Sequence, residues 1–318
     1  MVVIGLDLGG TKLSGAIFDQ KGNIISKATI YLANRQGKEV GEIIKKQIRK
    51  LFISARKNNF QVTAIGISVP GISYQKTGKV WAPNIPGWDD YPLYNEIFSE
   101  INNRSIKICI DNDRVCSIMG ELWMGKAKGC KDIIFLVVGT GIGAGILVNG
   151  KIVRGYSGAA GAVGWLALDR PFLSKYASCG CFEYYASGDG IAKAAREFVA
   201  EDDSYKGVLR TKQLEEISSF DVFAAYERGD AVARKVLAHA IEFWGMTVAN
   251  LVSLFNPEKI ILGGGIFGPA LKFRNEILHE SRKWAQPLSI SQVCLEGSAL
   301  GSDTALYGAG YLALKNIE

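Results

Sequence analysis

The sequence predicts an α/β protein in which one small fold occurs twice. Residues 2–31 contain three apolar runs, VVIGLDL, LSGAIFD and IISKATIY, separated by tight turns. Residues 132–154 repeat this order with DIIFLVV, AGILV and IVRG, and both copies carry a small-residue turn after the first run. Helical and strand-like stretches follow each copy, so we expect two similar lobes with a cleft between them.

The elements after each copy complete the two lobes. The first copy is followed by an amphipathic helix from Glu39 to Lys57 and by the strands TAIGISV and IKICIDN. A long helix from Asp230 to Phe255 and the strand KIILGGG follow the second copy. A last helix, from Ser302 to Leu314, is expected to pack back on the first lobe.

This order of elements predicts the domain limits. We expect residues 1–113 together with 302–318 to form a small N-terminal α/β lobe, and residues 114–301 to form a larger C-terminal one. The hinge is expected near Asp111 to Val115.

Composition excludes several classes of protein. The 318 residues are 48% hydrophobic and 21% charged, as in globular proteins with a real core. The net charge of +6 is modest. The densest basic run, Lys45 to Lys50, lies on the amphipathic helix, where a solvated helix face is favoured over a nucleic-acid patch.

The sequence also predicts a cytoplasmic protein. Asp7 interrupts the apolar start too early for a signal peptide, and no apolar run approaches the roughly 20 residues of a membrane span. The six cysteines are dispersed except for Cys179 and Cys181, so no disulfide framework is indicated and reduced thiols are expected.

Two glycine turns are candidate phosphate sites. DLGGTK and VVGTGIG both place glycine and threonine at the end of an apolar strand, where backbone N–H groups and a hydroxyl can approach an anion. A single such turn is equally typical of a plain hairpin, but two at matching places favour phosphate binding. The residues concerned are Gly9, Gly10, Thr11 and Lys12 in the first turn and Gly139, Thr140 and Gly141 in the second.

Two further features are candidates for binding a nucleotide and its magnesium ion. Asp7, just before the first turn, can hold a magnesium ion through water. Gly263, Gly264 and Gly265 end a strand where the sugar and base of a nucleotide can lie against backbone, although a tight strand-to-helix turn explains them equally well.

A candidate general base follows the strand IKICIDN. Asn112 and Asp113 are expected to point into the cleft, where a carboxylate can accept a proton from an attacking hydroxyl. The alternative is that Asp113 only caps the helix that follows it. The two phosphate turns favour catalysis.

Together these motifs resemble the ROK family of sugar kinases and sugar-responsive repressors, in the wider actin/hexokinase-like (ribonuclease H-like) fold. The likeness runs along essentially the whole chain. The stretches that carry it are GLDLGGTKLSGAIFD, SVPGI, GKVWAPNIPGW, DNDRVCSIMGE, GTGIGAGIL, NPEKIILGGGIFG and GSALGSDTALYGAGYLAL.

The resemblance implies roles for single residues. Asp113 would be the general base, and Asn112, Asn84 and Glu183 would bind sugar hydroxyls, with Gly71 in the sugar loop. Family members use ATP and magnesium, phosphorylate the primary hydroxyl of a hexose or N-acetylated hexosamine, and are often homodimers. The repressors carry an N-terminal helix-turn-helix; here the phosphate motif begins at Gly5, so we expect no DNA-binding domain and no nucleic-acid partner.

The chain departs from the family in GYSGAAGAVGWLALDR, residues 155–170. Where the family has Glu-x-Gly-His, this chain has Ala162, Val163, Gly164 and Trp165, so both polar sugar ligands are missing. The glycines are expected to shape a loop beside the sugar.

The family's zinc site is also incomplete. The histidine ligand is replaced by Trp165, and Ser174 and Tyr176 stand where the first two cysteines are expected. Cys181 matches the last cysteine and Cys179 is out of register, so structural zinc is not expected. His239 and His279 lie far away in helical segments and are expected to be surface or packing residues.

Two residues near the presumed acceptor have open roles. Trp165 either lies against the apolar face of a sugar ring or turns inward to fill the space of the missing ligands. Arg114 either recognises an anionic substituent of the substrate or points outward along its helix.

The sequence therefore predicts an ATP-dependent kinase for a hexose, hexosamine or related polyol, glucokinase-like, with Asp113 as general base. The alternative is a catalytically weak sugar-binding or regulatory ROK protein. A third possibility is a kinase with another donor such as polyphosphate.

Overall fold

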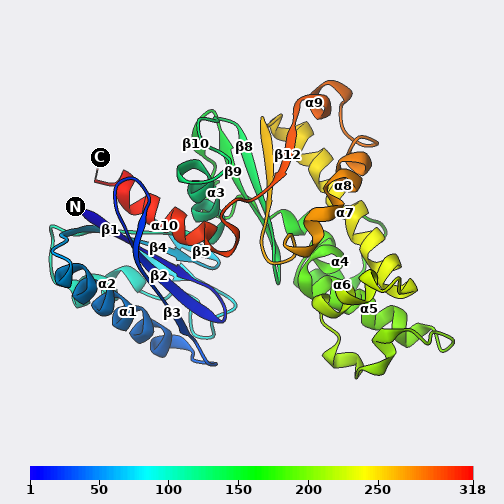
Figure 1. Cartoon of the computed structure of the whole chain (residues 1–318), viewed down its shortest axis with the longest axis horizontal. Coiled ribbons are helices and arrows are strands. Elements are labelled where there is room, and N and C mark those ends of the chain that lie inside the picture. Colours follow the sequence, from blue (N-terminus) through cyan, green and yellow to red (C-terminus); the bar gives the residue numbers. More distant parts are fainter. Residues whose placement is uncertain (318) are drawn as a thin grey trace. The chain divides into compact units, whose positions relative to one another are not determined.

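Two mixed five-stranded sheets of the same strand order form the framework of the protein (Figure 1). The computed structural model describes residues 1–317. They divide into two compact units. Unit 1 comprises residues 1–130, residues 152–160 and the chain from Ser302 onward, and unit 2 comprises residues 131–151 and 161–301.

Unit 1 contains a sheet with the order β3-β2-β1-β4-β7. Strand β1 is antiparallel to β2 and parallel to β4, and β4 is parallel to β7. The strands are β1 Val2–Leu8, β2 Lys12–Phe18, β3 Ile24–Tyr31, β4 Val62–Val69 and β7 Lys107–Asn112, with a small hairpin of β5 Ile72–Tyr74 and β6 Lys79–Trp81. The helices are α1 Gly37–Lys57, α2 Leu93–Ile101, α3 Asp113–Trp123 and α10 Thr304–Lys315.

Unit 2 repeats this topology with the order β10-β9-β8-β11-β12. The strands are β8 Ile133–Val138, β9 Ile142–Val148, β10 Lys151–Ile152, β11 Lys259–Gly263 and β12 Cys294–Gly297. The α-helices are α4 Cys181–Ala186, α5 Gly188–Glu201, α6 Ser219–Glu227, α7 Ala231–Phe255, α8 Arg274–Ser281 and α9 Pro287–Gln292. Short 3₁₀ turns include η1 Val163–Trp165, η2 Ser174–Ser178 and η6 Gly301–Asp303. The matching strand orders confirm the duplicated α/β fold.

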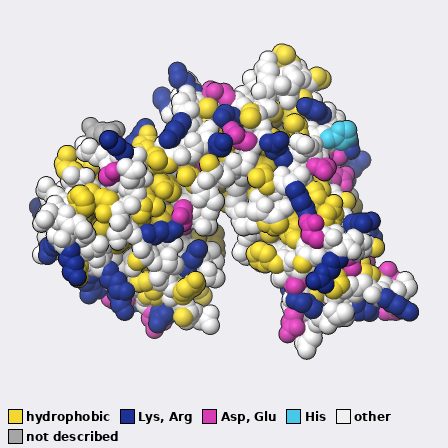
Figure 2. All heavy atoms as spheres, in the orientation of Figure 1, with side chains coloured by type: hydrophobic (Ala, Val, Ile, Leu, Met, Phe, Trp, Pro, Cys, Tyr) yellow, Lys and Arg dark blue, Asp and Glu magenta, His cyan; other side chains and the backbone are white. Residues whose placement is uncertain are grey.

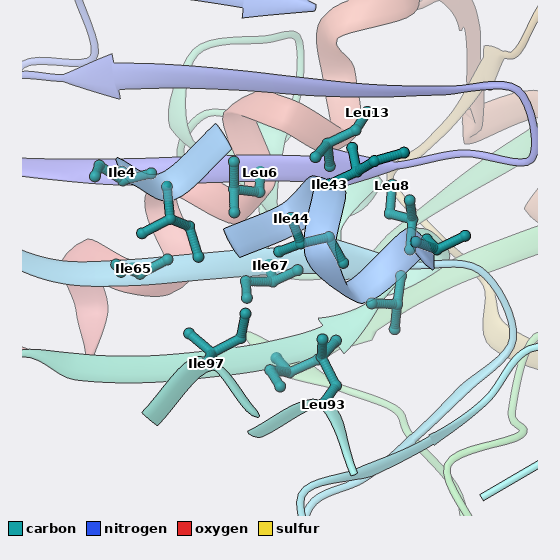
Figure 3. Close-up of a cluster of buried hydrophobic side chains, with 14 of the residues drawn as sticks. Ile4, Leu6, Leu8, Leu13, Ile43, Ile44, Ile65, Ile67, Leu93 and Ile97 are labelled. Carbon is teal, nitrogen blue, oxygen red and sulfur yellow. The ribbon is translucent and has the colours of Figure 1, made fainter. Parts of the chain in front are cut away.

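Alternation along β1 decides which side chains enter the core of unit 1. Ile4, Leu6 and Leu8 point to one face of the sheet, because successive side chains of a strand face opposite sides. Helices α1 and α2 cover this face, and Figure 3 shows Ile44 and Ile97 packed over the strand residues. Burial of this apolar surface provides the main driving force for folding of the unit.

On the other face of the sheet, α10 lies against the strands and against α3 (Figure 1). The helices approach closely because a Cβ atom on Gly308 would overlap the carbonyl oxygen of Cys116, and one on Gly120 would overlap that of Thr304. Helix α3 therefore belongs to unit 1, whereas the expected division placed residues 114–123 in the second lobe.

A nine-residue segment, residues 152–160, follows Lys151 of β10 in the chain and belongs to unit 1; we call it the strap. Its first residue, Ile152, packs against a buried cluster formed by Val115, Cys116 and Met119 of α3 with Leu312 of α10. Gly155 and Gly158 have φ of 72° and 79°, a region that L-residues with a side chain rarely adopt. Gly155 and Gly158 thus serve turns in the strap, whereas Gly161 and Gly164 of the same repeat belong to unit 2.

Helix α7 is the one helix among residues 1–317 that is long and apolar enough to cross a membrane by length and composition. It packs against α4, α5 and α8, and Phe243 and Trp244 are buried. These contacts are those of a core helix of unit 2.

Candidate active site

A polar row crosses the sheet of unit 1 near the carboxyl end of β1. Asp7 lies in register with Ser14 of β2 on one side and with Ser68 of β4 on the other. Ser68 is in turn opposite Asp111 of β7, and Ser14 is opposite Thr29 of β3. We call these five residues the polar rung. Residues in register on neighbouring strands face the same side, so the rung concentrates two carboxylates on one face of the sheet.

The carboxyl group of Asp7 is half-buried and hard to ionise. Its pKa is raised from 3.8 to about 6, mainly by burial and in addition by the charge of Asp113, while Ser68 and Lys12 oppose the rise. The electrostatic effect of Asp113 on Asp7 shows that the structure brings these two predicted residues together within unit 1.

Asn112, and not Asp113, caps helix α3. The side-chain Oδ1 of Asn112 accepts a hydrogen bond from the backbone N–H of Val115 at 2.9 Å. The alternative that Asp113 serves only as the helix cap is therefore wrong. Asp113 accepts a 2.8 Å hydrogen bond from the N–H of Arg114, and burial raises the pKa of its carboxyl group above the usual range.

Arg114 lies against the turn at Gly71, which is predicted to belong to a sugar loop. Its guanidinium donates to the carbonyl oxygen of Gly71 at 3.4 Å, and the side chain is half-buried. The expectation that Arg114 points outward is thus wrong. Gly71 itself has φ of 93°, and a Cβ atom there would overlap the carbonyl oxygen of Trp81, so only glycine fits this turn.

The first glycine turn is a hairpin connection between β1 and β2. The N–H of Gly9 donates to the carbonyl of Lys12 at 2.9 Å, and Gly10, Thr11 and Lys12 are exposed. A methyl group built on Gly10 would lie 3.9 Å from Nδ2 of Asn84, so the predicted sugar ligand Asn84 lies beside this turn.

In unit 2 the second glycine turn adjoins a helix N-terminus. The carbonyl of Gly139 accepts a 2.8 Å hydrogen bond from the N–H of Gly188, the first residue of α5, while Thr140 is exposed. Free N–H groups and the positive end of the helix dipole favour an anion at such a position.

The third glycine cluster, residues 263–265, lies beside the second glycine turn, residues 139–141. Gly264 has φ of 91°, and a Cβ atom there would overlap the carbonyl oxygen of Val138, immediately before Gly139. The N–H of Ile266 donates to that same carbonyl at 3.1 Å. The structure thus brings Gly263, Gly264 and Gly265 next to the turn of residues 139–141.

Glu183 occupies the base of the second turn. Its Oε2 accepts a 2.6 Å hydrogen bond from the N–H of Ile142, and a Cβ atom on Gly141 would lie 2.8 Å from the same oxygen. Burial raises the pKa of its carboxyl group, and the hydrogen bond from Ile142 opposes that effect. Glu183 therefore already has one backbone partner.

Trp165 is exposed, at 57% of its full accessibility, so its indole does not fill the space of the missing ligands. It follows Gly164, where a Cβ atom would lie 2.9 Å from Oε2 of Glu183. Trp165 therefore follows directly after Gly164, which lies close to the predicted sugar ligand Glu183.

The region where the family has its zinc ligands is held by aromatic packing. Tyr176 is buried, its ring contacts those of Tyr184 and Tyr185, and its hydroxyl lies 2.8 Å from that of Tyr185. His239 packs on Tyr185, which agrees with the packing role expected for it. Nowhere among residues 1–317 do three or more His, Cys, Asp or Glu side chains gather in a way that could hold a metal ion.

Sequence reasoning missed the partner of Asp111. This carboxylate is 2% exposed, and its Oδ2 accepts hydrogen bonds from Nε and Nη2 of Arg154 at 3.0 and 2.8 Å. No local sequence signal identifies the pair, because 43 positions separate the two residues.

The predicted site residues thus form two groups. Unit 1 carries Asp7, the first turn, Gly71, Asn84, Asn112, Asp113 and Arg114, and unit 2 carries the second turn, Trp165, Glu183 and the third glycine cluster.

Comparison with known proteins identifies the family of the chain. The family model described as "ROK family" matches residues 3–316. The chain is 31% identical over 317 residues to a glucokinase from Halalkalibacterium halodurans, covering 97% of this chain and 94% of that protein. It is 31% identical over 272 residues to a xylose repressor from Caldicellulosiruptor bescii, covering 82% of this chain and 65% of the repressor.

Solved structures show the same fold. A ROK family glucokinase from Streptomyces griseus, in complex with glucose and AMPPNP, superposes with a TM-score of 0.80 at 26% identity, covering 99% of this chain and 100% of that one. With a family model matched over nearly its whole length, the chain belongs to the ROK family.

Proposed function

We propose that the protein is an ATP-dependent kinase that phosphorylates a hydroxyl group, the primary one, of a hexose, hexosamine or related polyol. The observation that carries the proposal is the state of Asp113: its carboxylate is not the helix cap, and burial raises its pKa. A carboxylate of raised pKa is a stronger base for a neutral hydroxyl. Asp113 takes the proton as the hydroxyl oxygen bonds to the γ-phosphorus, and ADP leaves.

The donor side uses the glycine turns. ATP phosphates bind the backbone N–H groups of residues 9–11 and 139–141, with Lys12 as a counter-charge and Gly263 to Gly265 against the nucleoside. The donor set of Asp7 and the adjoining hydroxyl of Ser68 consists of oxygens, which suits Mg²⁺ held through water. Bound magnesium would neutralise charge on the phosphates.

The acceptor side combines amides and an aromatic surface. Asn84 and Asn112 offer amide groups, and Glu183 offers the carboxylate oxygens that Ile142 leaves free. The exposed indole of Trp165 lies against the apolar face of the acceptor. Arg114 acts by holding the Gly71 turn.

Replacing Trp165 by alanine tests the aromatic contact. The substitution should raise KM for the acceptor about tenfold, measured with the best substrate, and an unchanged KM contradicts this role.

A coupled ADP-release assay with Mg-ATP tests the proposal, across a panel of hexoses, hexosamines, ketoses, sugar acids and cyclitols. We expect strong turnover on one acceptor. Asp113→Asn should fold normally and lose at least about a hundredfold in kcat, since it cannot accept the proton.

The matched control is Asp169→Asn, which removes an exposed carboxylate from a loop of unit 2. Its kcat should stay within about twofold of wild type. Full turnover by Asp113→Asn would show that another group is the base.

The second candidate is a sugar-binding regulator with weak chemistry. The absence of the Glu and His ligands, at Ala162 and Trp165, and the similarity to a xylose repressor favour it. Tight sugar binding by calorimetry without ADP production would support this candidate. A third outcome, turnover with polyphosphate in place of ATP, would change only the donor.

We further propose a cytoplasmic enzyme that acts as a homodimer. Sedimentation at micromolar concentration tests the dimer, and a single species of 34.5 kDa would contradict it.

A further inference from the structure

The ion pair between the buried Asp111 and the part-exposed Arg154 is not used by the reaction proposed above. Asp111 is 2% exposed, and its carboxylate would be costly to bury without a partner. Arg154 supplies two hydrogen bonds to one oxygen, Oδ2, from Nε at 3.0 Å and Nη2 at 2.8 Å. Two donors from a planar guanidinium fix the orientation of the carboxylate as well as its charge.

The other oxygen of Asp111 connects this pair to the proposed base. Oδ1 accepts a 2.9 Å hydrogen bond from the N–H of Asn112, the residue that caps α3. Asp113 is the first residue of that helix. The orientation of Asp111 therefore acts directly on the backbone that presents Asn112 and Asp113.

Contacts on both sides of Arg154 in the chain hold the strap, and with it Arg154, in place. Ile152 packs against α3, and the carbonyl of Arg154 accepts a hydrogen bond from the N–H of Ala160 at 3.1 Å, which closes the strap into a loop. A methyl group on Gly158 would lie 3.4 Å from Ile72 of β5. Strand β5 in turn bonds to β7, because the hydroxyl of Ser73 donates to the carbonyl of Ile110 at 3.2 Å.

We propose that the strap, through Arg154, is a positioning device for the Asn112–Asp113 pair, and that Arg154 is a positioning residue for phosphoryl transfer. The inference rests on the proposed function for its kinetic consequence. Its structural consequence, order in the segment that follows Asp111, does not depend on any activity.

Arg154→Gln tests the device by removing the charge and the double hydrogen bond. We expect kcat to fall at least about tenfold, since small displacements of a reacting group lower rates strongly, while KM for ATP stays within about twofold. Arg154→Lys keeps the charge but not the paired donors, so it should recover only part of kcat.

A double substitution separates orientation from simple loss of charge. Arg154→Gln combined with Asp111→Asn leaves no buried unpaired charge, and an amide oxygen at position 111 can still accept from Asn112. Its kcat should therefore be higher than that of Arg154→Gln alone. The control is Lys151→Gln, an exposed charge three residues earlier, which should leave kcat unchanged.

Hydrogen–deuterium exchange provides the readout without activity. In Arg154→Gln, amides of residues 111–116 should exchange at least about tenfold faster, whereas those of residues 2–8 in β1 should not change. If the wild-type protein transfers no phosphoryl group to any acceptor, the proposed function fails, and the exchange experiment still decides on the strap.

Two results would overturn the inference. One is exchange in residues 111–116 that Arg154→Gln leaves unchanged, whatever happens to kcat. The other is faster exchange with kcat still within about twofold of wild type, which would give the ion pair a purely structural role.

Discussion

Asp7 is a carboxylic acid that the folded protein makes hard to ionise. Its pKa is about 6 in the fold against 3.8 for the ordinary side chain. Between these two values the folded protein keeps a proton that the unfolded chain releases. The free energy of unfolding therefore falls as pH rises from about 4 to about 6, and the loss persists at higher pH.

Asp7→Asn should for this reason stabilise the protein at pH 8 while impairing magnesium-dependent turnover. A shift of two pKa units corresponds to about 3 kcal/mol, and the partial exposure of Asp7 reduces this, so we expect a gain of about 1–3 kcal/mol. Urea unfolding without magnesium measures it at pH 8 and pH 4.5. The gain should nearly vanish at the lower pH, and equal effects at both values would contradict the assigned pKa.

The positions of some site residues could be predicted from the sequence, and the contacts of others could not. The positions of Asp7, Asp113 and the glycine turns follow from local patterns, since each ends or follows an apolar strand. The cap role of Asn112 and the pairing of Asp111 with Arg154 do not, because which side chain bonds to which backbone group depends on tertiary packing.

Among the elements, α3 and α10 depend on contact between backbones. Gly308 faces the carbonyl of Cys116 too closely for a methyl group, and neither partner is a flexible side chain that can move aside. Overpacking of this kind costs more than an ordinary core enlargement.

Gly308→Ala should therefore destabilise the protein by about 3 kcal/mol or more, even though alanine favours a helix over glycine. Urea midpoints measure the effect. Gly139→Ala, where a Cβ atom meets nothing within 4 Å, is the control and should change the free energy of unfolding by about 0.5 kcal/mol or less. A Gly308→Ala protein as stable as wild type would show that the helices can separate at little cost.

Elements with strong periodicity were predictable, and short ones were not. The sequence predicts β1, β2 and β3 and helices α1 and α7 to within two residues at either end. The hairpin β5–β6 and the 3₁₀ turns η1 and η2 have no repeat long enough to carry a signal. Helix α3 was expected in the other lobe. The sequence could not reveal its close contacts with α10, because they join segments far apart in the chain.

At the scale of the whole molecule, the basic side chains on the face drawn in Figure 2 are dispersed. On the face drawn in Figure 2, Lys and Arg side chains are spread among acidic and neutral ones. The basic run on α1 is partly neutralised, since Lys45 pairs with Glu42 and Arg49 lies 3.0 Å from Glu100. Basic side chains spread in this way on the face drawn form no continuous path for a phosphate backbone there, and the net charge of +6 is modest.

We therefore expect no DNA binding with a dissociation constant below about 10⁻⁵ M at 150 mM salt. Fluorescence anisotropy of a labelled 20-base-pair duplex measures it, with the salt concentration varied. Nanomolar binding that weakens steeply with salt would instead support a nucleic-acid partner.

The polar rung has a counterpart in unit 2 that carries no charge. Val137 stands in β8 where Asp7 stands in β1, and its neighbours in register are Gly143 and Gly263. A carboxylate repels phosphate unless a cation lies between them, so the uncharged row of unit 2 favours an anion at the turn of residues 139–141 without help from a metal. The two copies of the fold thus differ in charge at one register position, acidic in unit 1 and apolar in unit 2. If ATP binds as proposed, a phosphate approaching the first copy would need a metal ion to offset Asp7, and a phosphate approaching the second would not.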